Sequence, residues 1–126
     1  MRRNISLGSA AEENYAFSRG VVVGNTCYLA GITGADQTTS ILPESLAEQA
    51  ENCFGIIDVV LEKAGFSISG AVRVVYYISE PEFAGELGPI LRQKFEKIRP
   101  AATMIVAAFP SPAVKIEIEV TAVRDI

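Results

Sequence analysis

The fold is decided by Val114-Lys115-Ile116-Glu117-Ile118-Glu119-Val120-Thr121-Ala122-Val123. Consecutive side chains of a β-strand point to opposite faces of the sheet. Apolar side chains at even-numbered positions from 114 to 120 therefore share one face, and polar ones at odd-numbered positions share the other. The alternation predicts a strand with one buried face and one polar face.

Other β-rich runs precede this strand. Residues 103–109 form a predicted strand that Pro110-Ser111-Pro112 separates from it, and residues 71–78 are β-branched and aromatic, as in a mostly buried strand. Near the N-terminus, Gly24-Asn25 joins two runs, 15–23 and 26–30, which predicts a hairpin. Small polar residues over 31–40 indicate a loop.

Two helices are expected between the strands. Apolar residues recur every three or four positions between Pro43 and Gly65, and Gly65 is a suitable C-cap. A second apolar stripe runs from Phe83 to Ile98, but Pro89 lies inside it. Because proline in a helix interior costs about 3 kcal/mol, we expect a break or a fresh start near Pro89.

The expected order is β-β-α-β-α-β-β within 126 residues, which suits a single domain, 1–126. This order predicts an α+β fold with one mixed sheet and both helices packed on one face. The other face carries apolar segments at 21–23 and 105–108 that are poorly suited to water. A homo-oligomer with its sheets turned inward is the simplest cover.

Composition restricts the chemistry. The chain has no histidine, and Cys27 and Cys53 alone make a poor zinc site, so we expect no metal. A net charge of −4 without a basic stripe argues against a nucleic-acid partner. No apolar secretory segment follows residues 1–4 and no run approaches a membrane span, so we expect a cytoplasmic protein without a membrane partner.

The polar face of the last strand is a candidate site. Glu117 and Glu119 lie roughly 7 Å apart on it, so one can act as a base through water; the alternative is a solvated face with Lys115 pairing them. Arginine can clamp a carboxylate, although surface or interface ion pairs are more frequent; the candidates are Arg19, Arg73 and Arg99. The amides of residues 31–34 are a weaker candidate for anion binding.

The chain resembles the RidA (YjgF/YER057c/UK114-type) family along nearly its whole length. The matching segments are Phe17-Ser18-Arg19-Gly20-Val21-Val22-Val23-Gly24-Asn25-Thr26, Tyr28-Leu29-Ala30-Gly31, the helix with Glu48-Gln49 ending at Ala64-Gly65, Arg99-Pro100-Ala101, Lys115-Ile116-Glu117-Ile118-Glu119 and Ala122-Val123-Arg124. The resemblance implies a chorismate-mutase-like fold assembled as a homotrimer with clefts between subunits. It also implies a cofactor-independent hydrolase that releases ammonia from reactive enamines and imines.

The resemblance carries over to the site only in part. The arginine that holds the substrate carboxylate in the archetype is replaced by Ala102, and the helix asparagine aligns with Leu87 or Gly88. The early tyrosine becomes Phe17, and the serine before the glycine becomes Ala30. Among these aligned positions, the residues that keep their type are Gly31 and Glu117.

We therefore expect a small-molecule ligand in an intersubunit cleft, and an activity on a reactive imine, enamine or related carbonyl compound other than archetypal 2-aminoacrylate deamination. Glu117 is the predicted catalytic residue, which positions or activates water. The predicted substrate-binding residues are Phe17, Arg19, Ala30, Gly31, Ile32, Thr33, Ala102 and Thr103. The alternative is a non-catalytic trimeric module that binds a metabolite.

Overall fold

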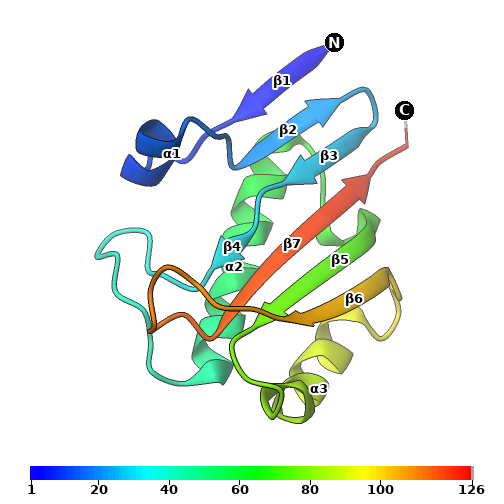
Figure 1. Cartoon of the computed structure of the whole chain (residues 1–126). Helices are drawn as coiled ribbons and strands as arrows, with labels where there is room; N and C mark the ends of the chain where they lie inside the picture. The colour runs from blue at the N-terminus through cyan, green and yellow to red at the C-terminus, as the bar shows by residue number, and fades with distance from the viewer. Residues whose placement is uncertain (126) are drawn as a thin grey trace.

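A computed structural model describes residues 1–125. One mixed sheet of seven strands forms the front layer in Figure 1, in the order β1-β2-β3-β7-β5-β6, with the short β4 also paired to β7. The β5–β6 pair is parallel and the other pairs are antiparallel. The strands are β1 (Arg2–Ile5), β2 (Gly20–Val23), β3 (Thr26–Leu29), β4 (Ile32–Thr33), β5 (Ala71–Ile78), β6 (Ala101–Val106) and β7 (Ile116–Val123).

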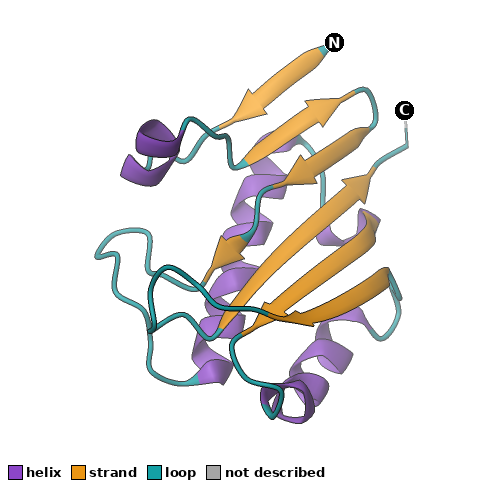
Figure 2. Cartoon of the chain, in the orientation of Figure 1, coloured by secondary structure: helices purple, strands orange, loops and turns teal. Residues whose placement is uncertain are grey.

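The two long helices lie behind the sheet, as Figure 2 shows. They confirm the predicted α+β class with both helices on one face. A six-residue helix lies beside the β1–β2 end of the sheet, and a 3-10 turn follows the longest helix. The helical elements are α1 (Ala10–Tyr15), α2 (Leu46–Ala64), η1 (Ile68–Gly70) and α3 (Phe83–Phe95).

Helix α2 has the boundaries that its sequence favours. The Ser45 side chain accepts a hydrogen bond from the Glu48 N–H at the start, and Gly65 ends the helix with a φ of 82°. Gln49 is fully buried but satisfied: its amide donates to the carbonyls of Pro43 and Ala113, and its oxygen accepts from the Lys115 N–H. This side chain thereby ties α2 to the segment that enters β7.

Helix α3 corrects the expected break at Pro89. The helix runs without interruption from Phe83 to Phe95 with Pro89 inside it. The ring of a proline meets the carbonyl of the residue four positions earlier, and that residue is Gly85, which adds no side chain to the crowding. Burial of Leu87 and Phe95 then holds the helix against α2, where Phe95 meets the Phe54 ring edge-on.

The core lies between the helices and the sheet. It includes the fully buried side chains of Phe54, Ile57 and Leu61 from α2 and of Ile116 and Ile118 from β7. Cys27 and Cys53 are buried free thiols, as predicted. One face of β7 therefore faces the core, and its glutamates lie on the opposite face.

The opposite face of the sheet is not covered by any described segment of the chain. Large apolar side chains stand exposed on it, among them Val23 and Tyr28 of the hairpin, Ile105 of β6 and Val123 of β7. We call this surface the open face. Within residues 1–125, no helix is long and apolar enough to cross a membrane.

Candidate functional site

Glu117 of β7 lies on the open face, beside the bend that connects β3 to β4. Thr33 of β4 pairs with Glu117 in the sheet, and Gly31 is the bend between β3 and β4. The Glu117 side chain packs directly against Gly31. A Cβ added to Gly31 would lie 2.8 Å from Cδ of Glu117 and closer still to Oε2. Glycine at this bend is therefore what allows the carboxylate to lie against the backbone.

The pKa of Glu117 is raised above its usual value. Partial burial is the main cause, because it disfavours the charged form, and the neighbouring Glu119 carboxylate adds to it. The positive charge of Arg19 acts in the opposite direction but does not cancel the other two effects. A carboxyl group shifted in this way holds and releases a proton closer to neutral pH, which suits acid–base work.

Glu119 is in a different environment. The Tyr77 hydroxyl donates a hydrogen bond to Oε1 of Glu119 at 3.0 Å, and this bond is the main reason that the pKa of Tyr77 is raised. Lys115 does not pair with either glutamate, since its ammonium group donates to the carbonyl of Glu44. The two carboxylates of β7 are thus distinguished by their surroundings.

Arg19 leads into β2 and lies against Phe17. Its guanidinium carbon is 5.2 Å from the centre of the Phe17 ring, and its Nε is 3.5 Å from Oε2 of Glu12. This is the one ion pair found within residues 1–125. Arg19 is therefore held within the chain while its charge still reaches Glu117. Arg73, the other strand-borne arginine, donates to the hydroxyl of Thr103.

The remaining predicted residues around Gly31 divide between the two sides of the sheet. The Ala30 N–H donates to the Arg19 carbonyl at 2.9 Å, which joins the strand bend to the Arg19 segment. Thr33 is partly exposed beside Glu117, whereas the Ile32 side chain is 1% exposed and belongs to the core. The structure brings Arg19, Ala30, Gly31, Thr33 and Glu117 together, and we call these five residues the Glu117 corner.

Ala102 and Thr103 of β6 lie apart from the Glu117 corner. Ala102 is opposite Val74 on β5, while Glu117 is opposite Tyr77. The two positions are three residues apart along the strands and two strands apart across the sheet, which is roughly 10 Å in each direction. Because side chains alternate along a strand, the odd spacing also puts them on opposite faces of the sheet. Thr103 faces the open side but sits at the far edge strand.

Ala102 lines a hollow of about 310 Å³ between α3 and the edge of β6. Arg92 and Arg99 also line it, and the Arg99 Nε donates to the Glu96 carbonyl. Arg99 has a φ of 53°, which is uncommon for a non-glycine residue. The sequence analysis did not name Arg92, which follows Leu91 of the apolar stripe of α3 and is itself exposed.

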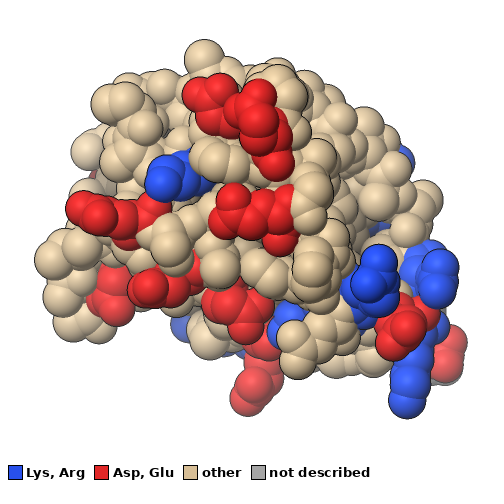
Figure 3. Space-filling model, turned by 90° about the horizontal axis from the view of Figure 1, so that it is seen from below, with Lys and Arg blue, Asp and Glu red and all other residues tan. Residues whose placement is uncertain are grey.

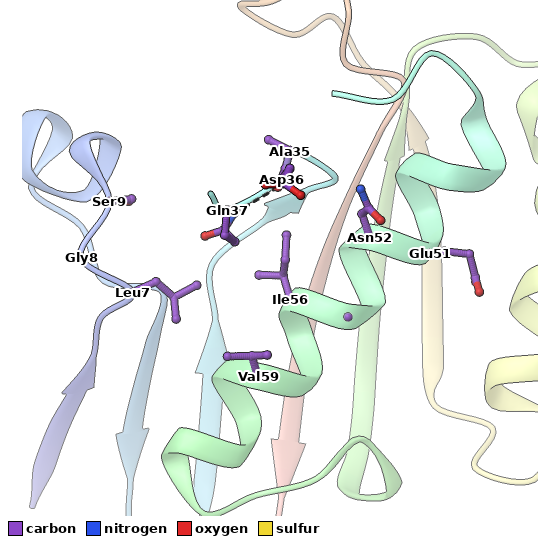
Figure 4. Close-up of a pocket in the computed structure, with 11 residues that line it drawn as sticks. Leu7, Gly8, Ser9, Ala35, Asp36, Gln37, Glu51, Asn52, Ile56 and Val59 are labelled. Carbon is purple, nitrogen blue, oxygen red and sulfur yellow. Dashed lines mark hydrogen bonds between the residues drawn. The ribbon is translucent and has the colours of Figure 1, made fainter. Parts of the chain in front are cut away.

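A separate cavity of about 470 Å³ lies on the flank of α2. Figure 4 shows Ile56 and Val59 of α2 facing Leu7, with the loop of residues 35–37 closing one side. Its polar residues include two carboxylates but no lysine or arginine, and Glu51 points away from the loop. None of the predicted site residues lines this cavity.

Within the described part of the chain, no three His, Cys, Asp or Glu side chains are grouped so that they could hold a metal ion. Burial raises the pKa of the Cys53 thiol to about 12, with the Glu117 charge adding to the effect. A thiol in that state is a poor nucleophile. The ionisable groups of the Glu117 corner are therefore one carboxyl group and one guanidinium.

A half-buried carboxyl group lies beside a glycine bend and a fixed cation, on the uncovered face of a small α+β sheet. This arrangement is chemically able to exchange a proton with a small molecule. A sequence profile described as endoribonuclease L-PSP matches residues 8–124. The chain therefore belongs to this family, which is the YjgF/RidA family that its sequence resembles.

The relatives span nearly the same length. A rat protein named 2-iminobutanoate/2-iminopropanoate deaminase is 29% identical over 126 residues, with 98% of this chain and 91% of the rat protein covered. A RutC family protein from Leuconostoc mesenteroides is 30% identical, with 98% of each chain covered. The crystal structure of a YjgF/YER057c/UK114 family member from Mycobacterium tuberculosis has a TM-score of 0.89 at 30% identity, covering 98% of this chain and all of that one.

Proposed function

We propose that the protein hydrolyses a reactive imine, an enamine or a related carbonyl metabolite, and that Glu117 is its catalytic residue. The observation that carries the proposal is the Glu117 carboxyl group, packed against Gly31 with a raised pKa. Membership of a family whose relatives include proteins named 2-iminobutanoate/2-iminopropanoate deaminase supports an imine deaminase-like activity.

The chemistry requires one water, and Glu117 twice carries a proton from an oxygen to the nitrogen. In the carboxylate form, Glu117 accepts a proton from a water molecule as the water oxygen bonds to the imine carbon. The same carboxyl group then returns the proton to the nitrogen, which gives a carbinolamine. The proton of the new hydroxyl group next passes through Glu117 to the nitrogen as the carbon–nitrogen bond breaks, and a ketone and ammonia leave. An enamine substrate first takes a proton on carbon to become the imine. A pKa moved toward neutral allows one group to take both roles.

The substrate lies, in this proposal, over the open-face side of Gly31. Backbone amides near Gly31 and the hydroxyl of Thr33 supply polar contacts from one subunit. The backbone amides near Thr103 and its hydroxyl, which lie at the far edge strand of the same chain, supply them from a neighbouring subunit. The Arg19 charge attracts a negative substituent, and the ring of Phe17 limits the size of the pocket.

Ala102 makes the substrate differ from that of the archetype. A bidentate charged contact is worth about 1.5–3 kcal/mol, so its loss weakens binding roughly tenfold to over a hundredfold. We therefore expect poor 2-aminoacrylate turnover and better turnover of a less acidic or more apolar imine. Arg92 and Arg99 remain as cations that can face a negative group, while Arg19 is held by Glu12 and Ser9 and can attract one only from its fixed position.

A homotrimer is part of the proposal. The Glu117 corner and the Ala102 hollow lie on opposite faces of one chain, so they can share a ligand only across a subunit boundary. Exposed apolar side chains such as Tyr28 and Ile105 supply the surface that assembly would bury. The proposal also places the protein in the cytoplasm, because the buried free thiols Cys27 and Cys53 suit a reducing compartment.

The partner is proposed to be a small molecule and not RNA, although the family description names an endoribonuclease. The net charge is −4. On the surface in Figure 3, acidic side chains are spread over one side and the middle, and basic ones gather mainly at the opposite end. RNA binding depends on neutralising many phosphates, and this distribution does not favour it.

The test is ammonia release from a panel of imines generated in the assay, including 2-iminobutanoate and 2-aminoacrylate. The proposal expects turnover of at least one imine that requires Glu117. No release from any imine, together with saturable binding of the corresponding keto acids, would instead support the alternative of a non-catalytic binding module. The apolar residues Phe17, Ala30 and Ala102 at positions that are polar in the archetype favour that alternative.

A further inference from the structure

Glu12 is a buried carboxylate whose position is not explained by helix capping alone. It is 7% exposed, in the first turn of the short helix α1. Oε2 accepts hydrogen bonds from the N–H groups of Leu7 and Ser9 and from the Ser9 hydroxyl, at 3.2, 3.1 and 2.8 Å. An N-terminal capping box needs the Ser9 bonds but needs neither burial nor a cation.

The cation is Arg19, which is fixed at both its backbone and its side chain. Its N–H donates to the Ile5 carbonyl and its own carbonyl accepts from the Ala30 N–H. Its Nε is 3.5 Å from the Glu12 carboxylate, and a terminal nitrogen donates to the Ser9 hydroxyl at 3.2 Å. Together with the Phe17 ring, these contacts leave the guanidinium little freedom to turn toward another anion.

The pair is charged but incompletely hydrogen-bonded. Within residues 1–125, Oε1 of Glu12 and Nε of Arg19 are buried without a hydrogen-bond partner. Unsatisfied buried polar atoms are rare in native proteins, so these two call for an explanation. Glu12 is buried and Arg19 is partly exposed, so the charge that Arg19 brings to the Glu117 corner is shared with a buried carboxylate.

Four ionisable groups act on Glu117 or are acted on by it. Glu119 lies on the same strand, Tyr77 on β5, Cys53 on α2 and Arg19 before β2. Arg19 is the cation among them. Its effect on Glu117 therefore depends on how much of its charge Glu12 already balances.

We propose that Glu12 is a positioning residue for the Glu117 corner. Its carboxylate holds the Arg19 guanidinium in place and balances part of its charge, so that Arg19 does not form a full ion pair with Glu117. The inference rests on the proposed function for the importance of Glu117, but not for its test. The consequence is that Glu117 releases its proton less readily than it would beside an unbalanced Arg19, and part of the Arg19 charge remains for a ligand.

The test is the titration of the Glu117 carboxyl group, which NMR monitors in protein labelled with ¹³C in its glutamate side chains. The signal of Glu117 is assigned as the one that disappears in Glu117→Gln. Glu12→Gln keeps an oxygen that accepts from Leu7 and Ser9 but removes the charge. It should lower the pKa of Glu117, because Arg19 is then unbalanced. Glu13→Gln is the matched control, since Glu13 is the exposed neighbour on α1, and it should leave the titration unchanged.

Glu12 could change the pKa of Glu117 through Arg19 or by its own negative charge acting directly. Repeating the titration in an Arg19→Gln background separates these two effects. The proposal expects Glu12→Gln to have a much smaller effect when Arg19 is absent. Arg19→Gln alone should raise the pKa of Glu117, and this result is available even if Glu12→Gln does not fold. An unchanged or raised Glu117 pKa in Glu12→Gln, an equal effect in both backgrounds, or no rise in Arg19→Gln would overturn the proposal.

The titration needs no substrate, so the two proposals fail separately. If no imine is hydrolysed but the predicted shifts occur, the positioning role of Glu12 stands and the proposed reaction fails. If ammonia is released but the shifts do not occur, the reaction stands and the role of Glu12 fails.

Discussion

Gly31→Ala tests the contact on which the site depends. The added Cβ would lie 2.8 Å from Cδ of Glu117, whereas ordinary contacts begin at 3.4 Å. The carboxylate must therefore move by at least 3.4 − 2.8 = 0.6 Å, and by more at Oε2. A displacement of about 1 Å in a catalytic group reduces turnover roughly a hundredfold. We expect kcat/KM to fall by about tenfold to a hundredfold.

The same substitution should change stability much less. The flexible end of Glu117 can yield, so the overpacking cost should be near the lower end of its usual range, about 1 kcal/mol. For a chain of this length, that corresponds to a fall in Tm of about 4 °C. Gly55→Ala is the control: nothing lies within 4 Å of its added Cβ, and alanine within a helix should stabilise the chain by about 0.5–1 kcal/mol.

The assays are ammonia release on the best imine and urea unfolding, each repeated in a Glu117→Ala background. If the carboxylate is the atom group displaced, Gly31→Ala should cost no stability in that background. An equal loss of stability with and without Glu117, or unchanged turnover in Gly31→Ala, would refute the reasoning.

Three further predictions concern pH, the core and assembly. Because the pKa of Glu117 is raised on folding, the stability it contributes is fully present below its unfolded value near 4.5 and is lost as pH rises through its folded pKa; Glu117→Gln should remove this part of a plot of unfolding free energy against pH. Gln49→Leu should leave three backbone groups without partners and cost roughly 3 kcal/mol or more in urea unfolding, whereas Leu at the exposed Gln93 should change little. Ile105→Asp should convert the proposed trimer to a monomer in light scattering coupled to gel filtration, and an unchanged mass would place the interface elsewhere.

Much of the fold follows from the sequence, because the longest elements carry the strongest periodic signals. The hairpin at Gly24-Asn25, helix α2 with its Gly65 cap, and strands β5 and β7 lie where the pattern predicts. The predicted break at Pro89 was wrong, because tertiary packing of α3 and the absence of a side chain at Gly85 outweigh the local cost of proline. Short elements such as β1, α1 and β4 escaped prediction, since they contain too few residues to show a period.

The site was predictable only in part. The alternation of β7 places Glu117 and Glu119 on one face, but it does not distinguish them; the Gly31 contact and the Tyr77 hydrogen bond do. That Arg19 is engaged by Glu12 depends on the fold of α1, which the sequence pattern does not reveal. The distance between Ala102 and Glu117 likewise could not be predicted, because it depends on the order of the strands in the sheet.

The most direct test of the central claim is the rate of ammonia release per subunit from the best imine substrate, measured for the wild-type protein, Glu117→Ala and Glu119→Ala. The carboxyl group against Gly31 is predicted to be the acid–base group, so Glu117→Ala should lower kcat by roughly a hundredfold or more, while Glu119→Ala, whose carboxylate is bonded to Tyr77, should retain most of it. Equal rates for the wild-type protein and Glu117→Ala, with both folded, would contradict the account.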